Sequence, residues 1–209
     1  MRVALVDYES GNLHSAEKAL VLAGREVGAE VVVTSDPAVV HAADRIVLPG
    51  DGAFPACRAA LDAVPGMVDA LREAVLDRGL PFLGICVGMQ MLADSGFEYR
   101  ETPGLGWIPG QIRAIEPVGL KVPHMGWNDL TIHRPHPVLE GIRTGDHAYF
   151  VHSWRFATAD RDDLIASVDY GGEITAIVGR DNIVGTQFHP EKSQDVGLRL
   201  ITNFLRWNP

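Results

Sequence analysis

The chain has 209 residues, a net charge of −9, 46% hydrophobic residues and two cysteines. This length suits one domain, so we expect residues 1–209 to form a single domain with a full hydrophobic core. The negative charge and the lack of a Lys/Arg cluster exclude nucleic acid and anionic membranes as expected partners. Two cysteines favour a reducing compartment over a disulfide framework. With no signal-peptide pattern and no membrane-spanning apolar run, we expect a cytoplasmic protein.

Strand and helix patterns alternate along the N-terminal half of the chain. Predicted strands lie at 3–6, 31–33, 46–48 and 80–85, and predicted helices at 12–23, 67–78 and 89–93. Gly24 and Gly79 are the stop signals of the first two helices. This alternation predicts an α/β fold, a flavodoxin-like open sheet that is mostly parallel, with helices on both faces.

The pattern changes between Gly104 and Gly185, where glycine, proline and β-forming residues dominate. Strands are predicted at 107–113, 128–132, 149–154, 164–168, 174–178 and 183–188. Asp181-Asn182 separates the last two and is a hairpin signal. A helix is expected at 196–207. The sequence therefore predicts an antiparallel β extension on the same domain.

Cys86 lies between two glycines, in Gly84-Ile85-Cys86-Val87-Gly88, after a predicted strand and before a predicted helix. This order is typical of a nucleophile elbow, in which glycines permit a sharp turn and the nucleophile adopts a strained backbone. The helix N-terminus would favour the thiolate form. The alternative is a buried cysteine that acts only as a small hydrophobe. That is how we interpret Cys57, a helix residue without chemistry.

His189-Pro190-Glu191 supplies a base and a group to orient it. Residues i and i+2 of an extended segment point to the same side, and Pro190 restrains His189 to an extended conformation. Glu191 can then hold the imidazole in the tautomer that takes a proton from Cys86. A lone His-x-Glu is more often a surface strand end. The glycines around Cys86 favour a catalytic triad of Cys86, His189 and Glu191.

Three features converge on the carboxyl edge of the predicted sheet, where ligands bind in open α/β folds. Cys86 and His189 each follow a strand, and so does the segment Pro49-Gly50-Asp51-Gly52. Backbone amides of Asp51 and Gly52, with that of Val87, would form an oxyanion hole. By itself, Pro49–Gly52 is more often only a turn.

These motifs resemble the class I (triad) glutamine amidotransferases over essentially the whole chain. The elbow and Phe188–Lys192 are shared by the wider family. The segment His124–Asn128 is similar to the family of glutaminase subunits of imidazole glycerol phosphate synthases, in histidine biosynthesis. Further matching segments are Asp7-Tyr8, Ser10–Leu13, Leu48–Gly50, Gly104–Gly110, Lys121–Pro123 and Tyr149–Trp154.

The resemblance implies that Cys86 attacks the amide carbon of glutamine, that His189 protonates the departing ammonia, and that water hydrolyses the thioester. It also implies that ammonia passes to a (βα)8-barrel cyclase subunit, which forms imidazole glycerol phosphate and aminoimidazole carboxamide ribotide. By the same resemblance, the glutamine-binding residues are Gln90, Glu98, His152, Ser153 and Trp154. The partner-facing residues are Asn12, Met125, Trp127 and Tyr149.

Two positions depart from the family pattern. Glu9 stands where glycine is common, and Asp51 stands where an apolar residue is common, which puts the oxyanion hole in question. We expect no cofactor and no metal site, because no Cys or carboxylate completes a site around His133 and His136.

Three other functions remain open on this sequence. One is another amidotransferase subunit of the same fold, such as the glutaminase of vitamin B6 synthesis, against which His124–Asn128 argues. Another is a hydrolase that acts alone, either a cysteine peptidase or a γ-glutamyl hydrolase. The last is a binding module without activity, which would be expected to have lost a member of the triad.

Overall fold

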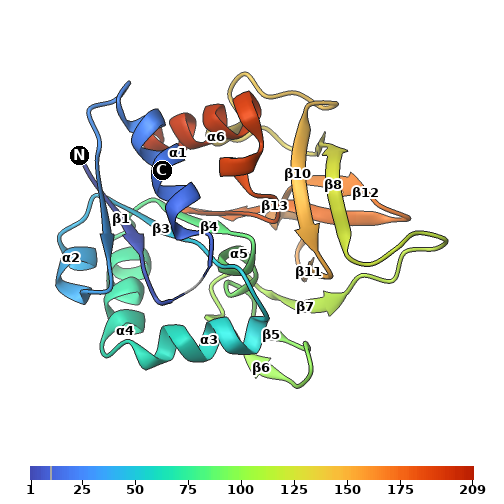
Figure 1. Ribbon diagram of the computed structural model, residues 1–209, viewed down its shortest axis with the longest axis horizontal. Coiled ribbons are helices and arrows are strands. Elements are labelled where there is room, and N and C mark those ends of the chain that lie inside the picture. Colours follow the sequence, from blue (N-terminus) through green and yellow to red (C-terminus); the bar gives the residue numbers. More distant parts are fainter. Residues whose placement is uncertain (10) are drawn as a thin grey trace.

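An eight-stranded sheet forms the centre of the protein in the computed structural model, which describes residues 1–9 and 11–209 (Figure 1). Five neighbouring strands are parallel, and three antiparallel strands extend one edge. In sheet order the strands are β2 (Glu30–Thr34), β1 (Arg2–Val6), β3 (Arg45–Leu48), β4 (Phe82–Ile85), β14 (Ile183–Thr186), β13 (Glu173–Arg180), β12 (Leu164–Asp169) and β9 (Thr131–Ile132). The predicted parallel sheet with an antiparallel extension is confirmed. Ser10, in one of the segments that carry the resemblance, lies outside the described residues.

Helices cover both faces of this sheet (Figure 1). They are α1 (Leu13–Gly24), α2 (Pro37–His41), α3 (Phe54–Ala63), α4 (Met67–Arg72), α5 (Val87–Gln90) and α6 (Gln194–Arg206). The first and last of these pack together on one face, and α2, α3 and α4 lie on the other. None of the helices in residues 1–9 and 11–209 combines the length and the apolar character needed to cross a membrane.

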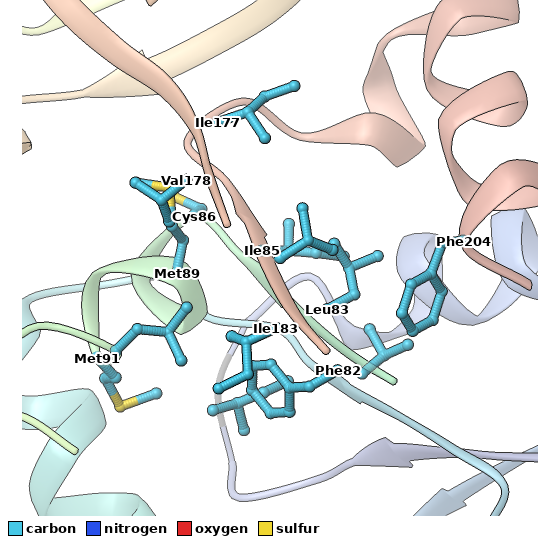
Figure 2. Close-up of a cluster of buried hydrophobic side chains, with 14 of the residues drawn as sticks. Phe82, Leu83, Ile85, Cys86, Met89, Met91, Ile177, Val178, Ile183 and Phe204 are labelled. Carbon is cyan, nitrogen blue, oxygen red and sulfur yellow. The ribbon is translucent and has the colours of Figure 1, made fainter. Parts of the chain in front are cut away.

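The central strands are apolar along their whole length because both of their faces are covered. All side chains of Phe82–Ile85 in β4 are buried, as are those of β14 beside it. Figure 2 shows the resulting apolar cluster, with Phe82, Leu83 and Ile85 packed near Ile183, and with Cys86 next to it. The nucleophile candidate therefore directly follows a fully buried central strand.

Two small sheets flank the extension. One pairs β8 (His124–Asp129) with β10 (His147–His152). The other contains β11 (Trp154–Thr158), β7 (Gly110–Ala114), β5 (Ser95–Gly96) and β6 (Thr102–Pro103). The end of β10 and the start of β11 are separated only by Ser153, so this residue joins the two sheets.

Two predicted strands were wrong because each is divided between sheets. The strand predicted at 128–132 is interrupted at Leu130, whose backbone bonds to Asp146 and Gly145 instead of continuing a ladder. The strand predicted at 149–154 is interrupted at Ser153, since β10 pairs with β8 and β11 pairs with β7. Apolar residues alternate on both sides of each break, so the sequence pattern does not show that the strand changes the strand with which it pairs.

Several predicted boundaries also differ. The helix predicted at 67–78 continues beyond α4 as a π-helical turn over Glu73–Asp77. The helix predicted at 89–93 is α5, which starts earlier and has only 4 residues. The strand predicted from Trp107 begins at Gly110, because the N–H groups of Trp107 and Ile108 donate to the Leu92 carbonyl. The predicted hairpin is confirmed, with Asp181 at a positive φ of 49° between β13 and β14.

Candidate active site

Cys86 follows β4 directly and has the strained backbone conformation φ 54°, ψ −111°. Glycine is required at positions 84 and 88 because neighbouring backbone atoms lie too close for a side chain, not because the backbone needs to be flexible there. A Cβ on Gly84 would lie 2.7 Å from the Gly88 carbonyl oxygen, and a Cβ on Gly88 would lie 1.9 Å from the Leu48 carbonyl oxygen. Only hydrogen fits at these two positions, so the sulfur is held on a sharp turn at the edge of the sheet.

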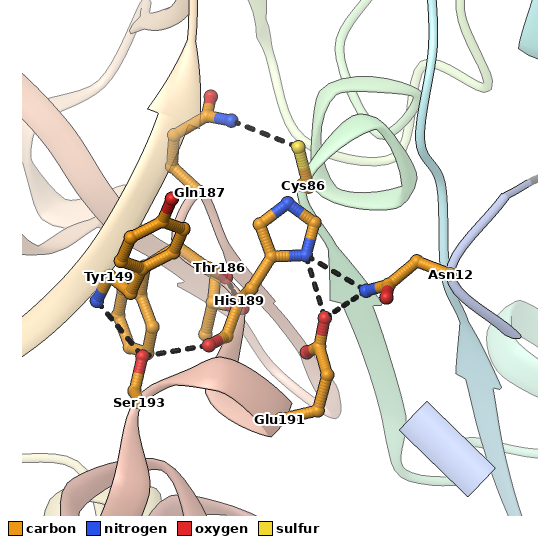
Figure 3. Close-up of polar contacts among 9 residues, drawn as sticks. Asn12, Cys86, Tyr149, Thr186, Gln187, His189, Glu191 and Ser193 are labelled. Atoms are coloured by element: carbon orange, nitrogen blue, oxygen red, sulfur yellow. Dashed lines mark hydrogen bonds and ion pairs between the residues drawn. The ribbon is translucent and has the colours of Figure 1, made fainter. Parts of the chain in front are cut away.

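His189 and Glu191 lie beside Cys86 because β14 runs next to β4 (Figure 3). His189 has the extended conformation φ −92°, ψ 101° ahead of Pro190. Its Nδ1 lies 2.7 Å from Oε1 of Glu191, and both side chains are buried. A carboxylate oxygen only accepts, so Nδ1 carries a proton and Nε2 is the nitrogen available for proton transfer. Figure 3 shows Nε2 on the side of Cys86.

The environment of His189 determines its charge. Burial alone would lower the pKa of His189, but interactions with Cys86 and Glu191 raise it, to about 10. Nε2 has no hydrogen-bond partner among the described residues. An imidazolium held next to a thiolate is the charge-separated pair that activates a cysteine nucleophile.

Asn12 contacts this pair from α1's N-terminal end. Its Nδ2 donates to Oε1 of Glu191 and lies 3.3 Å from Nδ1 of His189. Since Nδ1 also donates to this carboxylate, the amide of Asn12 acts by fixing Glu191. The sequence pointed to a partner-facing position for Asn12. The contact with Glu191 was missed because it joins residues that are 179 positions apart.

Gln187 is a second neighbour that the sequence did not reveal. Its Nε2 lies 3.7 Å from Sγ of Cys86, and its Oε1 accepts from Nε2 of Gln90 at 3.0 Å. The only signal was its position two residues before His189, which places both side chains on one side of an extended segment.

The turn expected to form the oxyanion hole lies over the elbow. The Val87 N–H is directed at the Gly50 carbonyl oxygen, at 3.4 Å. The Asp51 side chain is exposed and lies next to Gly11, where its Oδ2 is 3.3 Å from the position of an added Cβ. Gly52 has a φ of 135°, which favours glycine.

The residues expected to bind glutamine form two separate sets of contacts. In the first, Nε2 of Gln90 donates to the Trp154 carbonyl at 3.2 Å, and Nδ1 of His152 donates to the same carbonyl at 2.8 Å. Ser153 lies between His152 and Trp154 in the chain and is half-buried. In the second, Glu98 accepts from the Phe54 N–H at 2.7 Å. Burial, and then the charge of Cys86, raise the pKa of Cys57 to about 11, and Asp51 and Glu98 add to this. The side-chain hydrogen bond between Cys57 and Tyr8 acts in the opposite direction and lowers this pKa.

Comparison with known proteins identifies the family. The model of the "Glutamine amidotransferase class-I" family matches residues 4–207. The chain belongs to the class-I glutamine amidotransferases. It is 63% identical to the imidazole glycerol phosphate synthase subunit HisH of Cereibacter sphaeroides and 61% identical to that of Ruegeria pomeroyi, with 100% of each chain covered. A solved glutamine amidotransferase has the same fold, with a TM-score of 0.74, 20% identity and 97% of both chains covered.

In this amidotransferase, the strand β8 exposes two large apolar side chains. Met125 is 62% exposed and Trp127 is 48% exposed. The Trp127 ring packs edge-on against Tyr149 of β10, with centroids 5.9 Å apart. The Tyr149 carbonyl in turn accepts from the His189 N–H at 3.1 Å. Tyr149 thus links the expected partner surface to the candidate base through one backbone hydrogen bond.

The second departure from the family pattern is Glu9, and its backbone conformation explains why glycine is common at this position. Glu9 has a φ of 65°, in the left-handed region where glycine is least strained. Its side chain is exposed. No group of three or more His, Cys, Asp or Glu side chains in the described part of this amidotransferase is placed to hold a metal ion.

Proposed function

We propose that this chain is the glutaminase subunit of an imidazole glycerol phosphate synthase in histidine biosynthesis. The observation that carries this function is the full-length identity of 63% to a HisH subunit, in a chain whose strands β4 and β14 bring a cysteine and a His-Glu pair together. The chain hydrolyses glutamine to glutamate and ammonia. A cyclase subunit uses the ammonia to form imidazole glycerol phosphate and aminoimidazole carboxamide ribotide. We further infer a single domain over residues 1–209 and a cytoplasmic location.

The proposed reaction uses Cys86, His189 and Glu191. The Cys86 thiolate attacks the amide carbon of glutamine and forms a C–S bond. Nε2 of the His189 imidazolium gives its proton to the amide nitrogen, the C–N bond breaks, and ammonia leaves a thioester. Neutral His189 then takes a proton from water, and the hydroxide attacks the thioester to release glutamate and the thiolate. Glu191 keeps Nδ1 protonated in every step.

Substrate recognition is proposed for Gln90, Glu98 and the backbone of His152, Ser153 and Trp154. Both hydrogens of Nε2 of Gln90 are used by Trp154 and Gln187, so its amide oxygen is the atom left to accept from the substrate's α-amino group. Glu98 supplies a negative charge for the same group. The backbone of His152, Ser153 and Trp154 supplies polar groups for the α-carboxylate. Cys86 is only 5% exposed, so glutamine enters when the partner is bound and the surrounding turns open.

The oxyanion hole is proposed to form when the peptide between Gly50 and Asp51 turns over. That rotation would remove the Gly50 carbonyl from the Val87 N–H and direct the Asp51 N–H to the same point. Gly52, at φ 135°, allows the neighbouring backbone to follow. The Asp51 carboxylate stays outside, because two unit charges about 6 Å apart repel by roughly 3 kcal/mol at an effective dielectric near 20.

Asp51→Val tests this arrangement. We expect the glutaminase rate of the complex to stay within about twofold, because the backbone amide and not the carboxylate serves the hole. The rate without the partner should stay the same or rise. The measurement is glutamate release by the variant alone and in the complex. A tenfold or greater fall in the complex would mean that the carboxylate takes part in catalysis.

The partner is a cyclase subunit, and we propose that it is a (βα)8 barrel that docks on Met125, Trp127, Tyr149 and Asn12. Exposed aromatic and methionine side chains are common anchors of such interfaces. This surface reaches His189 through the Tyr149 carbonyl and Glu191 through Asn12. The proposed docking surface is therefore connected to His189 and Glu191 by direct hydrogen bonds.

The decisive experiment measures glutamate release by the purified chain alone, with the cyclase subunit, and with that subunit plus its substrate. We expect the rate to rise by about two orders of magnitude or more only when both are present, because a closed site and a blocked Val87 N–H restrain the free chain. Full activity in the free chain would favour the alternative of a hydrolase that acts alone.

Trp127→Ala tests the surface. Loss of an exposed interface aromatic typically costs about 2 kcal/mol or more of binding, so affinity for the cyclase subunit should fall about 30-fold, with an unchanged Tm. The measurement is calorimetric titration of the two subunits. Val118→Ala is the control, since Val118 is exposed on the loop between β7 and β8, outside the assigned surface. Equal losses in both variants would contradict the assigned surface.

A further inference from the structure

Gln187 is a buried polar residue beside the candidate nucleophile. It follows β14 and its side chain is fully buried. An amide in such a place must use its donors and acceptor, because an unpaired buried polar group costs stability. Its Nε2 donates toward Sγ of Cys86 at 3.7 Å, and its Oε1 accepts from Gln90. Figure 3 shows the amide and the His189 ring approaching the sulfur from different directions.

The orientation of this amide is fixed by a chain of obligatory donors and acceptors. The chain starts at the Trp154 carbonyl, which can only accept and therefore draws the NH2 group of Gln90 toward it. The same NH2 group then donates its second hydrogen to Oε1 of Gln187. With its oxygen turned to Gln90, Gln187 directs its own NH2 group at the sulfur. Nδ1 of His152 donates to the Trp154 carbonyl as well and helps to hold it in place.

We propose that Gln187 is a further catalytic residue, whose side-chain amide donates a hydrogen bond to the Cys86 thiolate, and that Gln90 is the positioning residue that aims it. This inference rests on the proposed role of Cys86 as the nucleophile. A donor close to a charged group favours the charged form, and the effect is large where water is excluded. Unlike His189, an amide cannot take the proton back. Gln187 thus stabilises the thiolate before attack and again when the thioester breaks.

The test measures how fast iodoacetamide alkylates Cys86 at different pH values in the complex with the cyclase subunit, in which the proposed opening of the site admits small molecules. Alkylation is followed by peptide mass. Gln187→Met removes the donor and keeps the volume of the side chain. We expect the pH at which alkylation is half-maximal to rise by about one unit.

Companion variants separate this role from a structural one. Thr186→Val is the matched control, because Thr186 is equally buried in the preceding position and its hydroxyl donates to the Phe188 carbonyl, not to Cys86. It should leave the midpoint unchanged. Gln90→Met should give a smaller rise than Gln187→Met, and the double variant should equal Gln187→Met, because Gln90 acts through Gln187. Gln187→Asn, whose amide is one methylene shorter, should reproduce the rise and carries the test if Gln187→Met does not fold.

The outcomes are distinct from those that test the proposed function. An unchanged midpoint in a folded Gln187 variant, or an equal rise in Thr186→Val, overturns this inference. If Cys86→Ser has also lost glutamine hydrolysis, the nucleophile assignment stands even then. A raised alkylation midpoint together with a lower kcat and an unchanged KM for glutamine supports the proposed role of Gln187, since a merely structural role would not shift a pH profile.

Discussion

Cys86→Ser is expected to abolish glutamine-dependent synthesis by the complex and to leave synthesis from added ammonia unchanged. The serine hydroxyl is a far weaker nucleophile at this position, and loss of a triad nucleophile typically costs more than about a thousandfold. The ammonia-dependent reaction belongs to the cyclase subunit and needs no thioester. Both rates can be measured on one preparation by following product formation with glutamine or with an ammonium salt.

Cys57→Ser is the matched control for that variant. Its Sγ lies 3.8 Å from the Asp51 carbonyl oxygen, a contact that a hydroxyl can also make. Both rates should therefore stay close to those of the unchanged chain. If Cys86→Ser kept more than about a tenth of its glutamine-dependent turnover, Cys86 would not be the nucleophile.

Gly88→Ala is expected to reduce glutaminase activity by about a hundredfold or to prevent folding. The new Cβ would lie 1.9 Å from the Leu48 carbonyl oxygen and 2.9 Å from its carbon, and neither backbone atom can rotate away as a side chain could. The turn must then move by about 1 Å, and a displacement of that size at a reacting centre can cost about a hundredfold in rate. The measurements are kcat/KM of the complex and the Tm of the free chain.

Gly79→Ala isolates the effect of the clash from that of the added methyl group. Gly79 has a φ of 69°, and nothing lies within 4 Å of a Cβ built there. We expect a loss of about 1 kcal/mol of stability from the strained backbone and full activity. A normal kcat/KM in Gly88→Ala would contradict the close packing of the elbow against β3.

Local sequence patterns predicted the parts of the fold in which neighbours in the chain are also neighbours in space. The buried runs of β1, β3 and β4 were found because strands covered on both faces are continuously apolar. The hairpin at Asp181 was found because its turn residues are specific. The interruptions at Leu130 and Ser153 were missed, since which strand pairs with which is decided by contacts far along the chain.

The same distinction holds for the site. Cys86, His189 and Glu191 were expected from short motifs, and the structure brings them together, although their roles stay predictions. Gln187 had only its spacing from His189 as a signal, because its place beside Cys86 depends on the pairing of β14 with β4. The contact of Asn12 with Glu191 carried no local signal, because it joins residues 179 positions apart. The state of the oxyanion turn could not be predicted either, because the direction of one peptide group leaves no trace in the sequence.

The adjacency of β4 and β14 has a consequence for how this enzyme is made. Cys86 leaves the ribosome before the β13–β14 hairpin exists, since Gln187 is 101 residues further along the chain. Until that hairpin docks, β4 is an unpaired sheet edge, and closing so long a loop makes the docking a slow step of folding. The cysteine therefore meets its base only after nearly the whole polypeptide has been synthesised. A nascent or truncated chain that ends before this hairpin carries the elbow without the His-Glu pair that the proposed reaction requires.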